Sequence, residues 1–361
     1  MITMMTLTEV NYYSKKMWPL VVILSLVLLI FIVAVRLLFM YSSSQSSTSE
    51  ISTGELIKFD PIFDKIPAPK IESVANSSEF SLIMDTLDGS ANVENATSAA
   101  KVYFIPQQNA SFGFLSKIYS MATAVGIDTD ITQHRLMDKT AIFDDGKRKL
   151  TIDIRTFNYI FEYKVSDNDD IGVAEILPSE AAIISDATTF LSSSGRYPTL
   201  LSQGDKGVSY IKFDPSTLEV TPLKTAENAN AAEVNAYLPD LNGIPVVSSN
   251  YYSSQNYVLT LLGSNSRKIV RAQVQHFERS AEQVGLYPIR SSQSAWEALQ
   301  SGEGVVVSSL NTSGEVKIRK VFLAYFDPPN YQEYFQPVYV FLGDDEFVGY
   351  VPAITPDFLL K

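Results

Sequence analysis

The sequence contains no cysteine and only two histidines among its 361 residues. Without cysteine there are no disulfide bonds, no thiolate metal site and no cysteine nucleophile. His134 and His276 are poor metal or catalytic candidates because they do not occupy matched positions in the internal repeat described below. Stability must therefore come from packed cores, and an exported chain without disulfides is typical of a bacterial cell surface or periplasm.

Familiar catalytic and cofactor-binding motifs are also missing. The chain has no G-x-S-x-G elbow, H-E-x-x-H pair, P-loop or G-x-G-x-x-G fingerprint. Gly146-Lys147-Arg148 is interpreted as a turn. The acidic stretch 167–170 is interpreted as a solvated loop rather than a calcium site, because Ile171 breaks the alternation of ligands and no glutamate follows at the required distance. The sequence therefore predicts no catalytic, cofactor-binding or metal-binding residues.

Basic side chains are outnumbered by acidic ones. There are 28 Lys and Arg residues against 40 Asp and Glu residues, which gives a net charge of −12 at pH 7. This balance disfavours a nucleic-acid partner, whose phosphates require a basic surface. It also argues against electrostatic docking of the outer part of the chain onto an anionic membrane surface.

One long apolar run lies near the N-terminus, at 17–40. Its first part, up to Val35, has no charged side chain and would give roughly 28 Å of helix, close to the ~30 Å of bilayer hydrocarbon. The run is too long for the core of a cleaved signal peptide. Lys15 and Lys16 precede it, so the positive-inside rule places the N-terminus in the cytoplasm. We therefore predict a single-pass protein of the cytoplasmic membrane, with a cytoplasmic tail at 1–16, a transmembrane helix at 17–40 and the remaining residues outside.

Arg36 is the one charged residue within this run. We expect it roughly 10 Å from the bilayer centre, where its long side chain reaches the outer headgroups. Two roles stay open for it: an interfacial anchor, or a contact with an acidic or carbonyl group on a partner's membrane helix. Arg36 is therefore the candidate for a partner contact in the membrane.

The segment 41–99 is expected to be a stalk and lead-in. It opens with a serine-rich spacer at 42–54, and three later prolines favour an extended path. One strand is expected within 80–87.

From about Ala100 the chain carries four landmarks that recur in order at offsets of 113 to 119 residues. They are a Gly-Ile pair, a basic pair that opens a strand, a Glu-Ala pair in a helix and a Phe-Asp-Pro turn. The matched positions are Gly126 and Gly243, Arg148 and Arg267, Glu180 and Glu297, and Phe213 and Phe326. This recurrence predicts a tandem duplication, with a first unit at 100–222 and a second at 223–361.

Each unit is expected to pack a helix on a curved antiparallel sheet, which makes the fold class α+β. Apolar residues at three- and four-residue spacing predict a helix within 112–125. Alternation in 157–165 predicts a strand with an aromatic face. Ser179 is expected to start one helix, and Ser294 with Glu297 to form the capping box of another. The closing meander is expected to contain strands at 321–326, 338–342 and 347–351.

The order of these features resembles a known family. The residues that carry the likeness are a single N-terminal anchor, two helix-and-meander units, and the segments SAWEALQSG, VFLAYFDP and PVYVFLGDDEFVGYVPA. They are similar to the YycH/YycI accessory proteins of bacterial sensor kinases, and the closing hairpin is similar to PepSY-type modules. The resemblance implies an extracytoplasmic, non-catalytic regulator that binds a partner's membrane helix and outer domain.

The leading hypothesis is therefore a non-enzymatic accessory or regulatory protein that contacts another membrane or envelope protein, such as a sensor kinase. One alternative is a cell-envelope hydrolase with a Ser-Lys or a two-carboxylate site, for which Asp214 and Asp327 in the matched Phe-Asp-Pro turns would be the first residues to test. A second alternative is a structural subunit of a surface assembly.

Overall fold

The computed structural model describes residues 58–93, 97–166, 169–170, 172, 177–264 and 266–360. The predicted cytoplasmic tail, the predicted transmembrane helix with Arg36, and the stalk up to residue 57 lie outside these residues. Among the helices that the structure describes, none is both long enough and apolar enough to cross a membrane.

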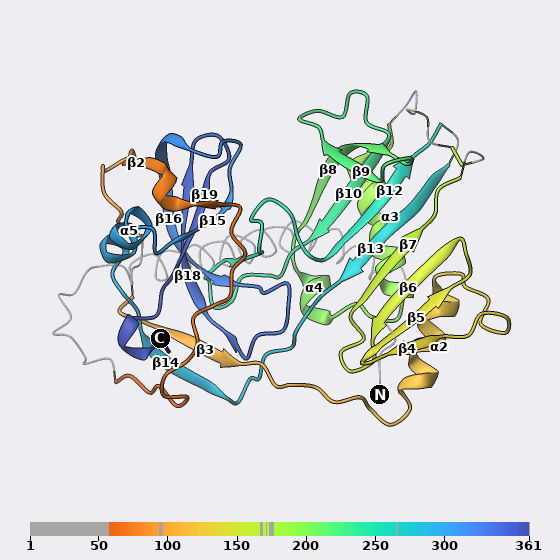
Figure 1. The fold of residues 1–361 in the computed structure, drawn as a ribbon, viewed down its shortest axis with the longest axis horizontal. Coiled ribbons are helices and arrows are strands. Elements are labelled where there is room, and N and C mark those ends of the chain that lie inside the picture. The colour runs from red at the N-terminus through yellow and green to blue at the C-terminus, as the bar shows by residue number, and fades with distance from the viewer. Residues whose placement is uncertain are drawn as a thin grey trace, which may run out of the picture. The chain divides into compact units, whose positions relative to one another are not determined.

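The described residues form a mixed α+β fold in which strands dominate (Figure 1), so the predicted fold class is confirmed. Their strands form three sheets of nine, seven and three strands. The helices of this part of the chain are α2 (Phe114–Ala124), α3 (Glu180–Ser193), α4 (Thr199–Gln203), α5 (Ser292–Gln300) and the short 3₁₀ helices η2 (Ser77–Glu79) and η3 (Pro356–Phe358).

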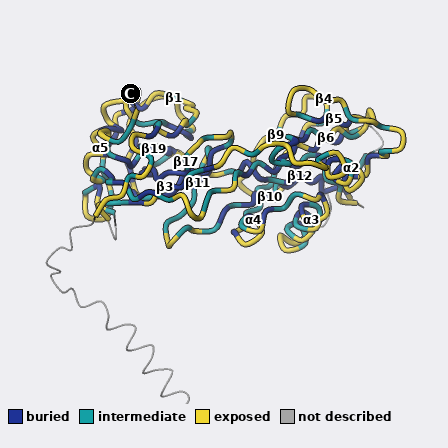
Figure 2. Tube along the Cα trace, turned by 90° about the horizontal axis from the view of Figure 1, so that it is seen from below, coloured by how far each residue is buried: buried dark blue, intermediate teal, exposed yellow. Residues whose placement is uncertain are grey.

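The nine-stranded sheet is antiparallel at every pairing. Its strands, in spatial order, are β4 (Arg135–Met137), β5 (Thr140–Asp144), β6 (Arg148–Asp153), β7 (Tyr159–Tyr163), β13 (Arg267–Val274), β12 (Tyr257–Leu262), β10 (Ala231–Ala236), β8 (Lys206–Asp214) and β9 (Glu219–Pro222). Buried residues run along the inner strands, whereas the two outermost strands, β4 and β9, hold none (Figure 2).

Helix α3 covers one face of this sheet. Ser179 caps it, because the Ser179 side chain accepts a hydrogen bond from the Ala182 amide, as the sequence predicted. The ring of Phe190 on α3 contacts the ring of Phe161 on β7, with centroids 5.4 Å apart. Since neighbouring residues of a strand point to opposite faces, Glu162 points away from α3. The aromatic alternation of β7 thus places its polar residue on the face that α3 leaves uncovered.

The other two sheets hold the C-terminal strands. The seven-stranded sheet contains β1 (Ala75–Asn76), β15 (Val305–Ser308), β19 (Val348–Pro352), β18 (Pro337–Gly343), β16 (Gly314–Phe326) and β11 (Val246–Val247), with β2 (Phe80–Met84) paired to β16. The three-stranded sheet is formed by β14 (Val284–Pro288), β3 (Ala99–Phe104) and β17 (Tyr334–Phe335). All three strands of the predicted closing meander are present as β16, β18 and β19, and the strand expected within 80–87 is β2.

Two local predictions need correction. The N-terminal cap of α5 is Ser291, whose side chain accepts a hydrogen bond from the Ser294 amide. The helix therefore begins one turn before the predicted capping box at Ser294 and Glu297. In α2 the predicted apolar face is only partly buried, because Ile118 and Ala122 are inaccessible whereas Leu115 is 47% exposed. Gly302, which follows α5, has a φ of 87°, the left-handed conformation that is common after a helix end.

The strand pairing does not divide the chain into two tandem units. Strand β8, before residue 222, pairs with β10, after residue 223, through Ile211 and Ala231. A boundary there would break the backbone hydrogen bonds of a continuous sheet. Phe213 and Phe326 do lie at comparable places, near the ends of β8 and β16. The matched residues Arg148 and Arg267, however, begin β6 and β13, which both belong to the nine-stranded sheet and so do not fall in separate units. The lead-in likewise supplies β1 and β2 to the seven-stranded sheet.

Candidate binding groove

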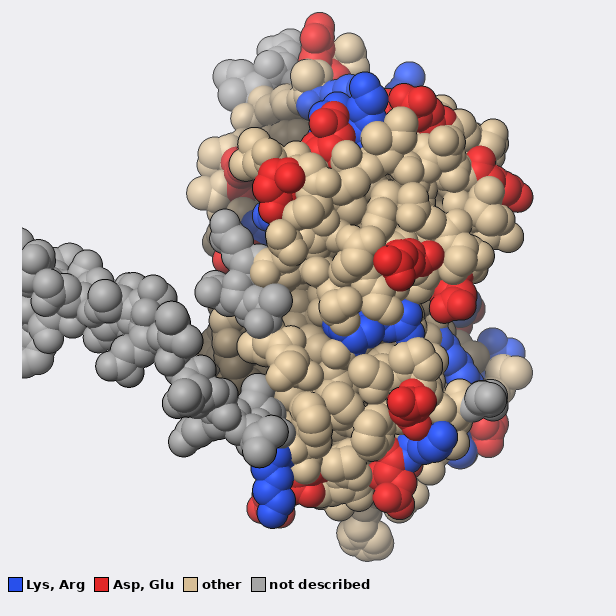
Figure 3. Space-filling view, turned by 90° about the vertical axis from the view of Figure 1, so that its left-hand side faces the viewer, with Lys and Arg blue, Asp and Glu red and all other residues tan. Residues whose placement is uncertain are grey.

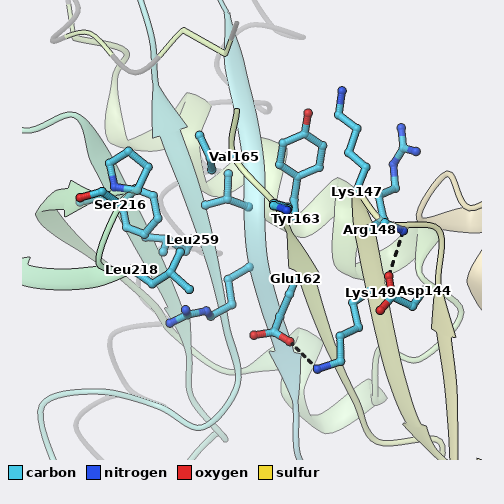
Figure 4. Close-up of a pocket in the computed structure, with 16 residues that line it drawn as sticks. Asp144, Lys147, Arg148, Lys149, Glu162, Tyr163, Val165, Ser216, Leu218 and Leu259 are labelled. Atoms are coloured by element: carbon cyan, nitrogen blue, oxygen red, sulfur yellow. Dashed lines mark hydrogen bonds and ion pairs between the residues drawn. The ribbon is translucent and has the colours of Figure 1, made fainter. Parts of the chain in front are cut away.

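A groove of about 500 Å³ lies on the nine-stranded sheet, on the face that carries Glu162 (Figure 4). One wall is formed by the turn between β5 and β6 together with the end of β7, and the other by the turn between β8 and β9. Strands β12 and β13 contribute Leu259, Val270 and Arg271 between these walls. Its volume falls in the range of roughly 300–1,000 Å³ that is usual for ligand pockets.

A β-bulge shapes the floor of the groove. The register between β12 and β13 shifts at Leu259 and Thr260. Bulges bend a strand, increase its twist and redirect side chains. Here the consecutive residues Val270 and Arg271 both line the groove, although neighbours in a regular strand point to opposite faces.

Charged residues form a row across the strands of the floor. Lys149 on β6 lies opposite Glu162 on β7, and Arg271 on β13 lies opposite Glu162 from the other side. The Lys149 Nζ atom is 3.4 Å from Glu162 Oε2. Leu259 on β12 lies opposite Arg271 and continues the row as an apolar residue. The single glutamate is thus placed between two cations.

Basic side chains outnumber acidic ones in the lining that the structure describes. The acidic residues are Asp144 and Glu162. The basic residues are Lys147, Arg148, Lys149, Lys164 and Arg271. The groove is therefore locally cationic, whereas the whole chain carries a net charge of −12. On the face shown in Figure 3, acidic and basic side chains are scattered over a largely uncharged surface.

The edge of the groove near Tyr163 is fixed by a second ion pair. Lys268 pairs with Asp169, and its Nζ atom lies 3.0 Å from the Tyr163 hydroxyl and 4.6 Å from the centre of that ring. Burial alone would raise the pKa of Asp169, but hydrogen bonds from Lys268 and Ser166 outweigh it and hold the pKa below its usual range. Asp169 thus serves as an ion-pair partner within the acidic stretch that the sequence suggested as a solvated loop.

Asp214 and Asp327, the carboxylates considered for a hydrolase, are not brought together. Asp214 ends β8, is exposed, and accepts hydrogen bonds from the amide and hydroxyl of Ser216. Asp327 follows β16 in another sheet and is buried, where it accepts a hydrogen bond from Gln255. A two-carboxylate site built from these two residues is therefore excluded by their positions in the fold.

The surroundings of Asp327 are polar but closed to solvent. Gln255 precedes β12, so its hydrogen bond joins the nine-stranded sheet to the end of β16. Arg279 lies over the rings of Tyr103 and Phe335, with its guanidinium carbon 5.8 and 5.2 Å from their centres. Burial raises the pKa of Asp327 to about 8, with Arg279 and Gln255 acting in the opposite direction.

His276 is buried. Its side chain is 2% exposed, and burial lowers its pKa to about 4. His134 lies elsewhere, with Nδ1 3.2 Å from the Tyr119 hydroxyl. The two histidines therefore do not form a pair.

The sequence contained a signal for the groove that motif searching missed. Lys147, Arg148 and Lys149 are three consecutive basic residues in an acidic chain, and the turn prediction for Gly146 is correct, since it has φ 85°. The turn also presents a basic wall, but the opposite wall lies far along the chain at Pro215 to Leu218.

No protein-family model matches the chain, and no curated protein is found to be similar to it. Among solved structures, an uncharacterized protein from Eubacterium rectale is similar with a TM-score of 0.34 and 14% identity over 72% of this chain and 84% of that one. YycH from Bacillus subtilis is similar with a TM-score of 0.33 and 11% identity over 72% of this chain and 53% of that one. These are weak architectural resemblances and do not show family membership.

Proposed function

We propose that this chain is a single-pass, membrane-anchored extracytoplasmic accessory protein that regulates another membrane or envelope protein, such as a sensor kinase, by direct contact. The observation that carries the proposal is the groove, whose basic and apolar walls stand on a sheet face that α3 does not cover. Such a surface suits the binding of a protein segment. The apolar run at 17–40 and the preceding Lys15 and Lys16 support the anchor and its orientation.

The two alternatives differ in what they require. A cell-envelope hydrolase would need a catalytic site other than the separated pair Asp214 and Asp327. A structural subunit of a surface assembly would contact further copies of itself. The proposed regulator would instead contact a different protein, and it would do so both within the membrane and outside it.

Photo-crosslinking in intact cells tests the proposal. A photo-crosslinking residue at Leu28, in the predicted transmembrane helix, and one at Ser216, on the groove wall, are expected to capture the same membrane or envelope protein. Arg36→Leu is expected to weaken the adduct at Leu28 without impairing insertion, since leucine is more apolar than arginine. The exposed Ser313, which does not line the groove, is the matched control position.

The possible outcomes distinguish the proposed regulator from a structural subunit. Adducts of the chain with itself alone would favour the structural subunit. A lack of any recurring partner at both positions would overturn the proposal. An unchanged Leu28 adduct in Arg36→Leu would leave Arg36 as an interfacial anchor.

A further inference from the structure

We propose that the groove binds an extended segment of a partner protein in which acidic and apolar residues alternate. The inference rests on the proposed function, because it names the chemistry of the partner segment that the groove receives.

The charge of the lining selects an acidic occupant. Lys147 and Lys164 are both exposed, and within the described residues neither has a carboxylate at ion-pair distance. The Lys147 Nζ atom lies 5.4 Å from the centre of the Tyr163 ring. Glu162 is held by Lys149 and lies opposite Arg271, so its charge is compensated within the groove. An incoming carboxylate thus meets cations whose charge is not already balanced.

The opposite wall selects apolar side chains. Leu218, in the turn between β8 and β9, is 53% exposed and has a φ of 60°. This left-handed conformation disfavours leucine and suits glycine or asparagine. An exposed leucine in a strained turn is costly for folding, and it adds apolar surface to a groove already lined by Phe213 and Leu259. Leu218 is therefore placed where a ligand would cover it.

The two walls together select an extended and alternating pattern. Figure 4 shows Lys147, Arg148 and Lys149 on one side of the groove and Leu218 on the other. In an extended strand, successive side chains point in opposite directions. A strand lying between the walls therefore directs its acidic residues to one wall and its apolar residues to the other. A helix, which places residues three and four apart on one face, would not match this division as well.

Peptide binding to the full-length chain in nanodiscs of neutral lipid measures this specificity. The probe is a fluorescent peptide with alternating glutamate and valine residues, followed by anisotropy. One control peptide has the same composition arranged as an acidic block and an apolar block, and another has lysine in place of glutamate. We expect the alternating peptide to bind most tightly, and its affinity to fall as salt is raised.

Two groove variants test the walls separately. Lys147→Glu combined with Lys164→Glu is expected to weaken binding about tenfold. Leu218→Gly is expected to weaken binding about fivefold while leaving the melting temperature unchanged or higher, because glycine tolerates the left-handed turn. The matched controls are Lys101→Glu with Lys320→Glu, and Leu310→Gly, at exposed positions outside the groove lining. These controls should bind the peptide as the unaltered chain does.

Each other outcome overturns the inference in a defined way. Equal binding of the alternating and block peptides rejects the extended, two-walled mode. Binding that survives both groove variants places the peptide elsewhere. Displacement of the peptide by phosphatidylglycerol vesicles reassigns the groove to anionic lipid.

The peptide experiment is independent of the crosslinking experiment. Loss of peptide specificity with a persistent partner adduct at Ser216 rejects this inference and leaves the proposed function standing. Specific peptide binding without any partner adduct supports the groove chemistry and rejects the proposed function.

Discussion

At the residue scale, Gly204 lies where two backbone segments approach each other closely. This residue follows α4, and a Cβ added to it would overlap the carbonyl oxygen of Tyr237. The Tyr237 amide bonds to the neighbouring Asp205 carbonyl at 3.0 Å, so the two segments cannot separate without losing that bond. Gly204→Ala is expected to lower the free energy of unfolding by about 2 kcal/mol or more, measured by urea denaturation.

The matched control is Gly89→Ala. Gly89 has φ 69°, and a Cβ there would meet no atom within 4 Å. Only the left-handed backbone conformation then opposes alanine, at a cost of about 1 kcal/mol. If Gly204→Ala is no more destabilising than Gly89→Ala, the close approach to Tyr237 is absent in solution. Nothing in the sequence near Gly204 indicates this contact, because Tyr237 lies on another strand connection.

At the element scale, the start of α5 gives a sharp comparison. The Ser291 side chain accepts a hydrogen bond from the Ser294 amide, with 3.1 Å between Oγ and N. Ser291→Ala should therefore lower the free energy of unfolding by about 1 kcal/mol, whereas Ser294→Ala, within the first turn, should change it little. Thermal unfolding followed by circular dichroism measures both. If Ser294→Ala is more destabilising than Ser291→Ala, the helix is capped by Ser294 as the sequence predicted.

Local signals predicted many elements but not how they pair. Ser179 was located correctly because it is followed directly by an apolar helical pattern, whereas Ser291 and Ser294 both have plausible spacings and only packing separates them. Alternation revealed the buried face of β7 but could not show that β13, far along the chain, pairs with it. Sheet membership depends on such distant pairing, which is why the predicted boundary at 222/223 fails.

At the scale of the whole molecule, the same limit applies to the groove. Its basic wall is visible in the sequence as three consecutive cations, but Leu218 joins the same groove only through the pairing of the strands between β6 and β9. The α+β class follows from periodicity, whereas a concave surface follows from twist and from the bulge at Leu259. A site assembled in this way carries no fixed spacing that a motif could capture.

The contact between Gln255 and Asp327 links the sheets and predicts a dependence of stability on pH. Burial raises the pKa of Asp327 to about 8 in the folded state, whereas an unfolded aspartate titrates near 4. Between these values the folded chain retains a proton that the unfolded chain has released. The free energy of unfolding should therefore fall as pH rises through this window, by up to about 1.4 kcal/mol per pH unit from this group.

Asp327→Asn isolates this effect, because asparagine is similar in shape, keeps an oxygen that can accept from Gln255, and does not titrate. Urea unfolding of both chains at about pH 5 and about pH 8 gives the difference in stability between them. We expect the free energy of unfolding of the variant to rise relative to that of the unaltered chain as pH rises. The pKa of His276 is lowered to about 4 in the folded chain. When pH falls below the pKa that this histidine has in the unfolded chain, the unfolded chain takes up a proton that the folded chain does not, so His276 makes stability rise with pH, opposite to Asp327. Because His276 is present in both chains, its contribution cancels in the difference. A difference that stays constant with pH would mean that Asp327 is ionised in the folded protein, with Arg279 as the cation that compensates it.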